Sequence, residues 1–70
     1  MKMDEKTRMM LNEIASSIQE AGFEPYDQIV GYLRTGNDRY ITRTGNARER
    51  IKEIDRKILK QYAAYLKAKE

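Results

Sequence analysis

The sequence has neither cysteine nor histidine, and this absence removes the common ways of reinforcing a small fold. Disulfides need cysteine, and the usual structural zinc sites need cysteine or histidine ligands. A chain of 70 residues also has a small core, because it buries only about 60% of the surface that its unfolded form exposes. We therefore expect a single domain, residues 1–70, that forms a homodimer.

Long apolar runs are missing as well. No stretch approaches the roughly 20 apolar residues that cross a bilayer. The N-terminal "MKMDEKTRMM" has charges where a signal peptide needs its apolar region. A cysteine-free composition suits a reducing compartment. We expect a cytoplasmic protein without a membrane partner.

The residue types of common catalytic centres are scarce. No histidine or cysteine can act as base or nucleophile, and no serine lies beside a plausible base. The acidic residues are scattered through charge-rich segments, where a solvated helix surface is the simplest interpretation. We expect no enzymatic activity, no cofactor and no metal.

Apolar residues recur with the period of a helix in the first half of the chain. Two groups keep the i, i+3, i+4, i+7 spacing: Leu11, Ile14, Ala15 and Ile18, then Tyr26, Ile29, Val30 and Leu33. They predict helices over 4–21 and 25–36. Gly22 and Gly36 are suited to ending them, and Pro25 suits the first turn of the second.

The second half predicts one short helical turn over 37–41, with Tyr40 and Ile41 pointing inward, and one long helix. Asn46 is suited to capping this helix, which we expect over about 47–68. Its apolar line is Ile51, Ile54, Ile58, Tyr62 and Tyr65, widened by Leu59 and Leu66. No strand alternation is present. The predicted fold class is all-α, a compact small bundle of three main helices and one short turn.

Gly31 interrupts the second predicted helix. A glycine inside a helix costs roughly 1 kcal/mol relative to alanine. Close approach of another backbone would explain it, and a hinge is the alternative.

Charge is unevenly distributed along the chain. Residues 1–36 carry four Lys and Arg against six Asp and Glu, a net charge of −2, whereas residues 37–70 carry ten against five, a net charge of +5. On the last predicted helix, basic residues are spaced four apart, which places them along one side. This basic stripe consists of Arg48, Lys52, Arg56 and Lys60, with Arg43 just before it.

Two interpretations of the basic stripe are open. It can be a solvated face that pairs with its own acidic neighbours, or a surface that binds an anionic partner. Like charges four residues apart repel one another, which favours the binding surface. The candidate partner-binding residues are Arg43, Arg48, Lys52 and Arg56. Because they lie off the apolar line, we expect their replacement to cost within about 0.5 kcal/mol each.

The stretches "QIVGYL" and "TGNDRYI", followed by "NAR" and Ile51, resemble the IreB-like family of small regulatory phosphoproteins from Gram-positive bacteria. The family pattern is matched by Gly22, Phe23, Pro25, Gln28, Ile29, Val30, Gly31, Tyr32, Leu33, Thr35, Gly36, Tyr40, Ile41, Arg43, Ala47, Arg48 and Ile51. The structural motif that we take from it is Gln28, Ile29, Val30, Gly31, Tyr32, Leu33, Gly36, Tyr40 and Ile41. The resemblance runs from about Gly22 to Leu66. It departs at Asn37-Asp38, where the family usually has Asp-Pro.

The resemblance implies a helical homodimer that is not an enzyme. It also implies control of cell-wall precursor synthesis, and so of antibiotic resistance, through the turnover of a biosynthetic enzyme. The protein partner would be that enzyme or a protease adaptor. The family also carries a longer N-terminal segment with a phosphorylated threonine, and on this alignment the present chain begins after it. Thr7 falls within the first predicted helix, so the phosphosite is not assigned to it.

A nucleic-acid-binding dimer is the alternative function, since a basic helix is common in small DNA-binding proteins. Two features disfavour nucleic acid as the partner. Glu49, Glu53 and Asp55 are interleaved with the basic stripe and would face phosphates. The net charge of +3 is also low for this class.

Overall fold

The computed structural model describes residues 4–69, which form helices and turns without a strand. The α-helices are α1 (Glu5–Glu20), α2 (Pro25–Thr35), α3 (Ala47–Ile51) and α4 (Arg56–Lys69). Two 3₁₀ turns, η1 (Asp38–Tyr40) and η2 (Thr44–Asn46), lie between α2 and α3. The predicted all-α class is confirmed, although the described residues contain four α-helices instead of three.

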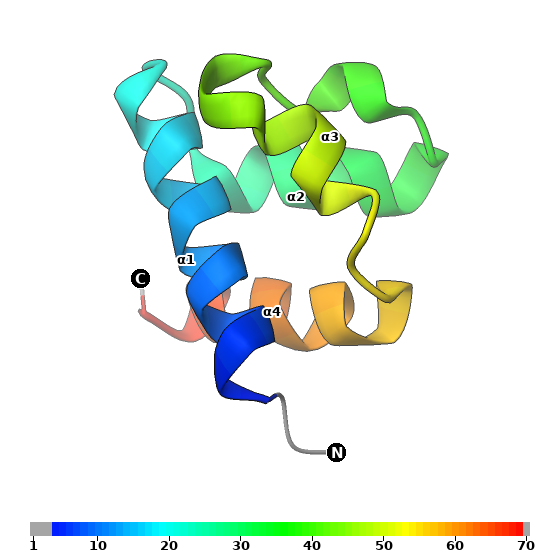
Figure 1. Cartoon of the computed structure of the whole chain (residues 1–70). Coiled ribbons are helices and arrows are strands. Elements are labelled where there is room, and N and C mark those ends of the chain that lie inside the picture. Colours follow the sequence, from blue (N-terminus) through cyan, green and yellow to red (C-terminus); the bar gives the residue numbers. More distant parts are fainter. Residues whose placement is uncertain (1–3, 70) are drawn as a thin grey trace.

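α1 packs against α3, and α2 packs against α4; contact between α1 and α2 joins these two pairs (Figure 1). α1 contacts α3 and η2, whereas α2 contacts α4 and η1, and α1 and α2 also contact each other. The chain thus returns from α2 through the two 3₁₀ turns to α3, and α4 then closes the other side of α2. One core lies between these elements.

Isoleucine and leucine dominate this core. The buried side chains are those of Leu11, Ile14, Ala15, Ile18, Ile29, Ile41, Ala47, Ile51, Ile54, Leu59, Tyr62 and Ala63. The four residues predicted to form the inner face of α1 are all among them. In α2 only Ile29 of the predicted apolar face is fully buried, and Tyr26, Val30 and Leu33 pack against the core with part of their surface exposed.

The single long helix predicted over 47–68 is wrong, because the chain breaks between α3 and α4. α3 ends with a tightened turn, in which the Ile54 N–H donates to the Ile51 carbonyl at 3.1 Å. Asp55 then caps α4, since its carboxylate accepts a hydrogen bond from the Lys57 N–H at 2.7 Å. An aspartate in this position satisfies one of the free N–H groups of a new helix, so it restarts the helix in a new direction.

The break changes which face of α4 is buried. The inner residues are now Leu59, Tyr62 and Ala63, with Leu66 partly buried at the i+7 position. Tyr65 is 53% exposed, so its predicted place on the apolar line is wrong. Leu59, which was expected at the edge of the line, is fully buried.

The predicted helix ends are largely confirmed. Asp4 caps α1 by accepting from the Thr7 N–H at 2.7 Å. Gly22 and Gly36 follow the ends of α1 and α2 with left-handed backbones. Asn46 precedes α3 as expected, but its side chain makes no capping hydrogen bond.

Gly31 is not crossed by another backbone, and a hinge is not needed to explain it. A Cβ atom at Gly31 would lie 2.6 Å from Cδ1 of Tyr40, because the Tyr40 ring lies against this side of α2. The ring itself remains 48% exposed, so the inward position predicted for Tyr40 is wrong. The neighbouring Ile41 is fully buried, as predicted.

At Gly45 the chain comes so close to α1 that only glycine fits. Its backbone is left-handed, with φ of 60°, and a Cβ atom there would lie 2.3 Å from the Oγ of Ser17 on α1. The turn between Arg43 and α3 therefore packs against α1 without space for a side chain.

We expect Gly45→Ala to destabilise the protein more than Gly22→Ala. Both positions have a left-handed backbone, which costs alanine roughly 1–2 kcal/mol. Only at Gly45 must Ser17 also move, since nothing lies within 4 Å of a Cβ at Gly22. Urea unfolding of the two variants measures the difference, and equal losses would show that η2 does not pack closely on α1.

Candidate functional site

The candidate partner-binding residues do not form one straight stripe. Arg43 precedes η2, Arg48 lies in α3, Lys52 follows the end of α3, and Arg56 is the first residue of α4. The break between α3 and α4 separates the first three from Arg56. The predicted continuous stripe is therefore wrong in its geometry, and each residue has its own surroundings.

Arg48 reaches back to the segment before it. Its Nε donates to the carbonyl oxygen of Ile41 at 2.9 Å, in a partly buried position. A buried carbonyl that loses its donor costs free energy. Arg48 is therefore a structural residue as well as a candidate for binding, and its replacement should cost more than the small amount expected for an exposed arginine.

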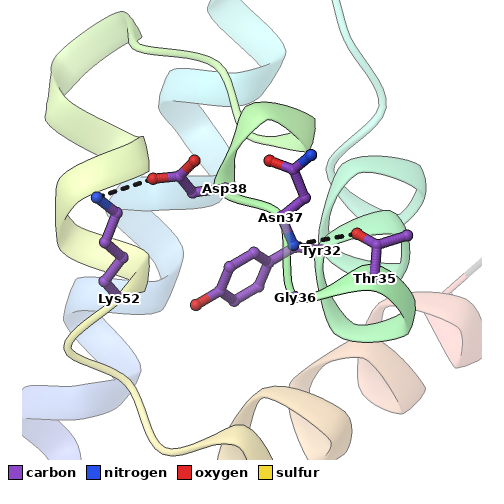
Figure 2. A pocket seen from close by; sticks show the side chains of 6 residues that line it. All are labelled: Tyr32, Thr35, Gly36, Asn37, Asp38 and Lys52. Atoms are coloured by element: carbon purple, nitrogen blue, oxygen red, sulfur yellow. Dashed lines mark hydrogen bonds and ion pairs between the residues drawn. The ribbon is translucent and has the colours of Figure 1, made fainter.

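Lys52 lies beside a shallow hollow of about 570 Å³ (Figure 2). Its Nζ is 2.8 Å from Oδ2 of Asp38 and 3.3 Å from Oε1 of Glu49. On the other side of the hollow, the Asn37 N–H donates to Oγ1 of Thr35. Lys52 and Asp38 thus pair with each other, as do Asn37 and Thr35, and we interpret the hollow as part of the scaffold.

Arg56 joins the start of α4 to the end of α2. Its Nη2 donates to the carbonyl oxygen of Leu33. Leu33 is in the last turn of α2, where carbonyl groups lack helical partners and carry the negative end of the helix dipole. Arg56 therefore has a structural partner of its own.

Arg43 and Arg48 share a second hollow with Arg39, which the sequence did not single out. This arginine hollow has a volume of about 640 Å³. It is lined by Phe23, Asp27, Gln28, Arg39, Tyr40, Thr42, Arg43 and Arg48. The described structure thus brings together two of the four candidate residues and adds a third arginine.

The arginine hollow has an excess of positive charge. Among residues 4–69 no ion pair involves Arg39, Arg43 or Arg48. Asp27 is the one carboxylate in the lining. Guanidinium groups in this arrangement can each form two parallel hydrogen bonds to a carboxylate. The hollow is suited to an anionic group of a partner.

Two other kinds of site receive no support from the described part of the chain. No group of three or more acidic side chains there could hold a metal ion. Within the same residues, no helix combines the length and the apolar character needed to cross a bilayer.

A family model described as "IreB regulatory phosphoprotein" matches residues 1–67. The chain belongs to this family, which is a regulatory one. The match starts ahead of Gly22, where we expected the resemblance to begin, so the similarity extends through α1. Five motif residues have a structural role in the fold. Ile29 and Ile41 are buried in the core, Gln28 accepts a hydrogen bond from Thr42, Gly31 lies against Tyr40, and Gly36 ends α2.

The ion pair between Asp38 and Lys52 should make stability depend on pH in the acidic range. The hydrogen bond from Lys52 lowers the pKa of the Asp38 carboxyl below its usual 3.8. The folded state therefore binds this proton less readily than the unfolded chain does. The stabilisation is present above the unfolded value and is lost as the pH falls through the lowered pKa.

Urea unfolding of the wild type and Asp38→Asn over acidic pH measures this contribution. We expect the free energy of unfolding of the wild type to fall more steeply below pH 3.8 than that of the variant. Asp4→Asn is the comparison variant. The pKa of Asp4 is lowered by a different hydrogen bond, from Thr7, so this variant should also have a flatter profile than the wild type while the contribution of Asp38 remains. Identical pH profiles for wild type and Asp38→Asn would contradict the role of the pair.

Proposed function

We propose that this protein is a non-enzymatic regulator that acts by binding a protein partner through Arg43 and Arg48. The observation that carries the proposal is the position of these two arginines in the arginine hollow, without an ion pair among the described residues. Membership of a regulatory family supports it.

Each candidate residue has a distinct part in this proposal. Arg43 is exposed and makes bidentate contacts with carboxylates, which lysine cannot imitate. Arg48 uses its Nε for the Ile41 carbonyl and presents its two terminal nitrogens to the partner. Lys52 and Arg56 lie outside the hollow and contribute mainly to electrostatic steering.

The partner that we propose is an enzyme of cell-wall precursor synthesis or a protease adaptor that controls its turnover. This identity follows from the resemblance to IreB-like proteins, and the acidic surface that the arginines require is compatible with either. The regulated property is the amount of the biosynthetic enzyme.

We also propose that the protein is a homodimer. Two large apolar side chains outside the arginine hollow, Met9 and Tyr65, are 57% and 53% exposed. A second copy can cover such side chains and add to a small core.

Light scattering across micromolar concentrations tests the homodimer. We expect twice the chain mass for the wild type and a shift toward the single-chain mass for Met9→Ser combined with Tyr65→Ser. A single-chain mass throughout the range for the wild type would contradict the dimer.

Partner binding should depend on Arg43 and Arg48 in different ways. Arg43→Ala should change stability by less than about 0.5 kcal/mol, as expected for an exposed site. Arg48→Ala should cost about 1 kcal/mol, because the Ile41 carbonyl loses its donor. Both should abolish retention of the partner in an affinity pull-down, and Arg43→Lys should weaken it.

Arg34→Ala is the matched control, since Arg34 is an exposed arginine on α2 outside the hollow. It should retain the partner. If Arg43→Ala melts like the wild type and still retains the partner, the arginines are a solvated surface. If the wild type instead retards DNA in a gel with steep salt dependence, nucleic acid is the partner.

A further inference from the structure

The arginine hollow combines its charges with two exposed aromatic rings. Phe23 is 53% exposed and Tyr40 is 48% exposed, and both line the hollow beside Arg39, Arg43 and Arg48. A site that bound its partner through charge alone would not need these aromatic rings. This hollow is as shallow as the one beside Lys52, but its lining combines apolar rings with a few convergent charges, which is the composition of a binding surface.

Local structure holds the backbone of Phe23 and the ring of Tyr40. The Phe23 N–H donates to the Ile18 carbonyl at 3.1 Å, which fixes the chain as it leaves α1. The Tyr40 ring lies against Gly31, where a Cβ atom would be 2.6 Å from its Cδ1. A site that is already formed loses less conformational entropy on binding. The missing side chain at Gly31 thus allows the position that Tyr40 takes at the hollow.

Lys52 keeps the surroundings of the hollow positive. Next to the arginine hollow lies a smaller one, which Asp38 and Glu49 line together with the same three arginines. Lys52 Nζ pairs with both of these carboxylates, at 2.8 and 3.3 Å. Lys52 thus compensates the negative charges of Asp38 and Glu49, which would otherwise lie beside the three arginines.

We infer that the arginine hollow binds a short acidic segment of a partner protein, with an apolar side chain of that segment seated against Phe23 and Tyr40. The carboxylates on either side of this apolar side chain pair with Arg39, Arg43 and Arg48. This inference rests on the proposed function and specifies the chemistry of the partner. It makes Phe23, Arg39 and Tyr40 contact residues, and Gly31 a positioning residue.

The probe is a short fluorescein-labelled peptide in which one leucine is flanked by glutamate and aspartate residues. Fluorescence anisotropy measures its affinity for the full chain at low and moderate salt. Two control peptides replace the leucine by serine, or all carboxylates by the corresponding amides. We expect each change to weaken binding about tenfold or more, because the contacts with the rings and with the guanidinium groups both contribute.

Matched variants separate the hollow from the rest of the surface. Phe23→Ser and Arg39→Ala should weaken binding of the probe, whereas Arg34→Ala, at a similarly exposed site on α2, should not. Gly31→Ala should also weaken it without lowering the melting temperature, since alanine favours the helix but displaces the Tyr40 ring. Loss of probe binding with a retained fold is the expected signature of a positioning residue.

Three results would overturn the inference. The first is binding of the leucine and serine peptides with equal affinity, which would leave the rings without a role. The second is equal loss of binding in Arg39→Ala and Arg34→Ala, which would indicate a diffuse charge effect. The third is a change of mass on light scattering for Phe23→Ser, which would assign the hollow to contact between copies.

The proposed function can stand when this inference fails. If the partner from the pull-down still depends on Arg43 and Arg48 while the probe does not bind, the partner uses a folded acidic surface instead of a short segment. If neither the partner nor the probe depends on these arginines, both proposals fail.

Discussion

The position of the arginine-bearing segment depends on how Ile41 and Thr42 are held. The Ile41 side chain is fully buried, and its carbonyl accepts a hydrogen bond from Arg48 at 2.9 Å. The Thr42 N–H donates to Oε1 of Gln28 on α2 at 2.9 Å. These contacts fix the chain between η1 and η2 from both sides. Arg39 and Arg43 therefore come from a segment that is tied to the core, although neither side chain is buried.

The break between α3 and α4 allows α4 to pack against α2 and to complete the small core. In its actual direction α4 contacts α2, and Leu59 and Tyr62 join the core. Tyr62 also links α4 to α1, because its hydroxyl donates to Oδ1 of Asn12 at 3.1 Å. The same break ends the basic stripe after Lys52. The packing of α4 into the core therefore separates Arg56 and Lys60 from the other basic residues of the stripe.

Features set by local sequence could be predicted, and contacts between distant elements could not. The inner face of α1 and the glycines that end α1 and α2 follow from helical spacing and backbone conformation within a few residues. The break was missed because the apolar spacing continues through Ile54, and an aspartate there is equally common on a solvated helix surface. The contact of Tyr40 with Gly31 and the addition of Arg39 to the site depend on how η1 folds back onto α2, which no local pattern specifies.

Native-state hydrogen exchange at the Thr42 amide tests most directly whether the arginine-bearing segment is anchored. If Gln28 and Ile41 hold the segment as part of the core, this amide should exchange through the same opening as the Ile29 and Val30 amides in the middle of α2. Its protection should fall selectively in Gln28→Ala while protection in α1 is retained. Exchange of the Thr42 amide in the wild type as fast as that of an unfolded chain would contradict the account.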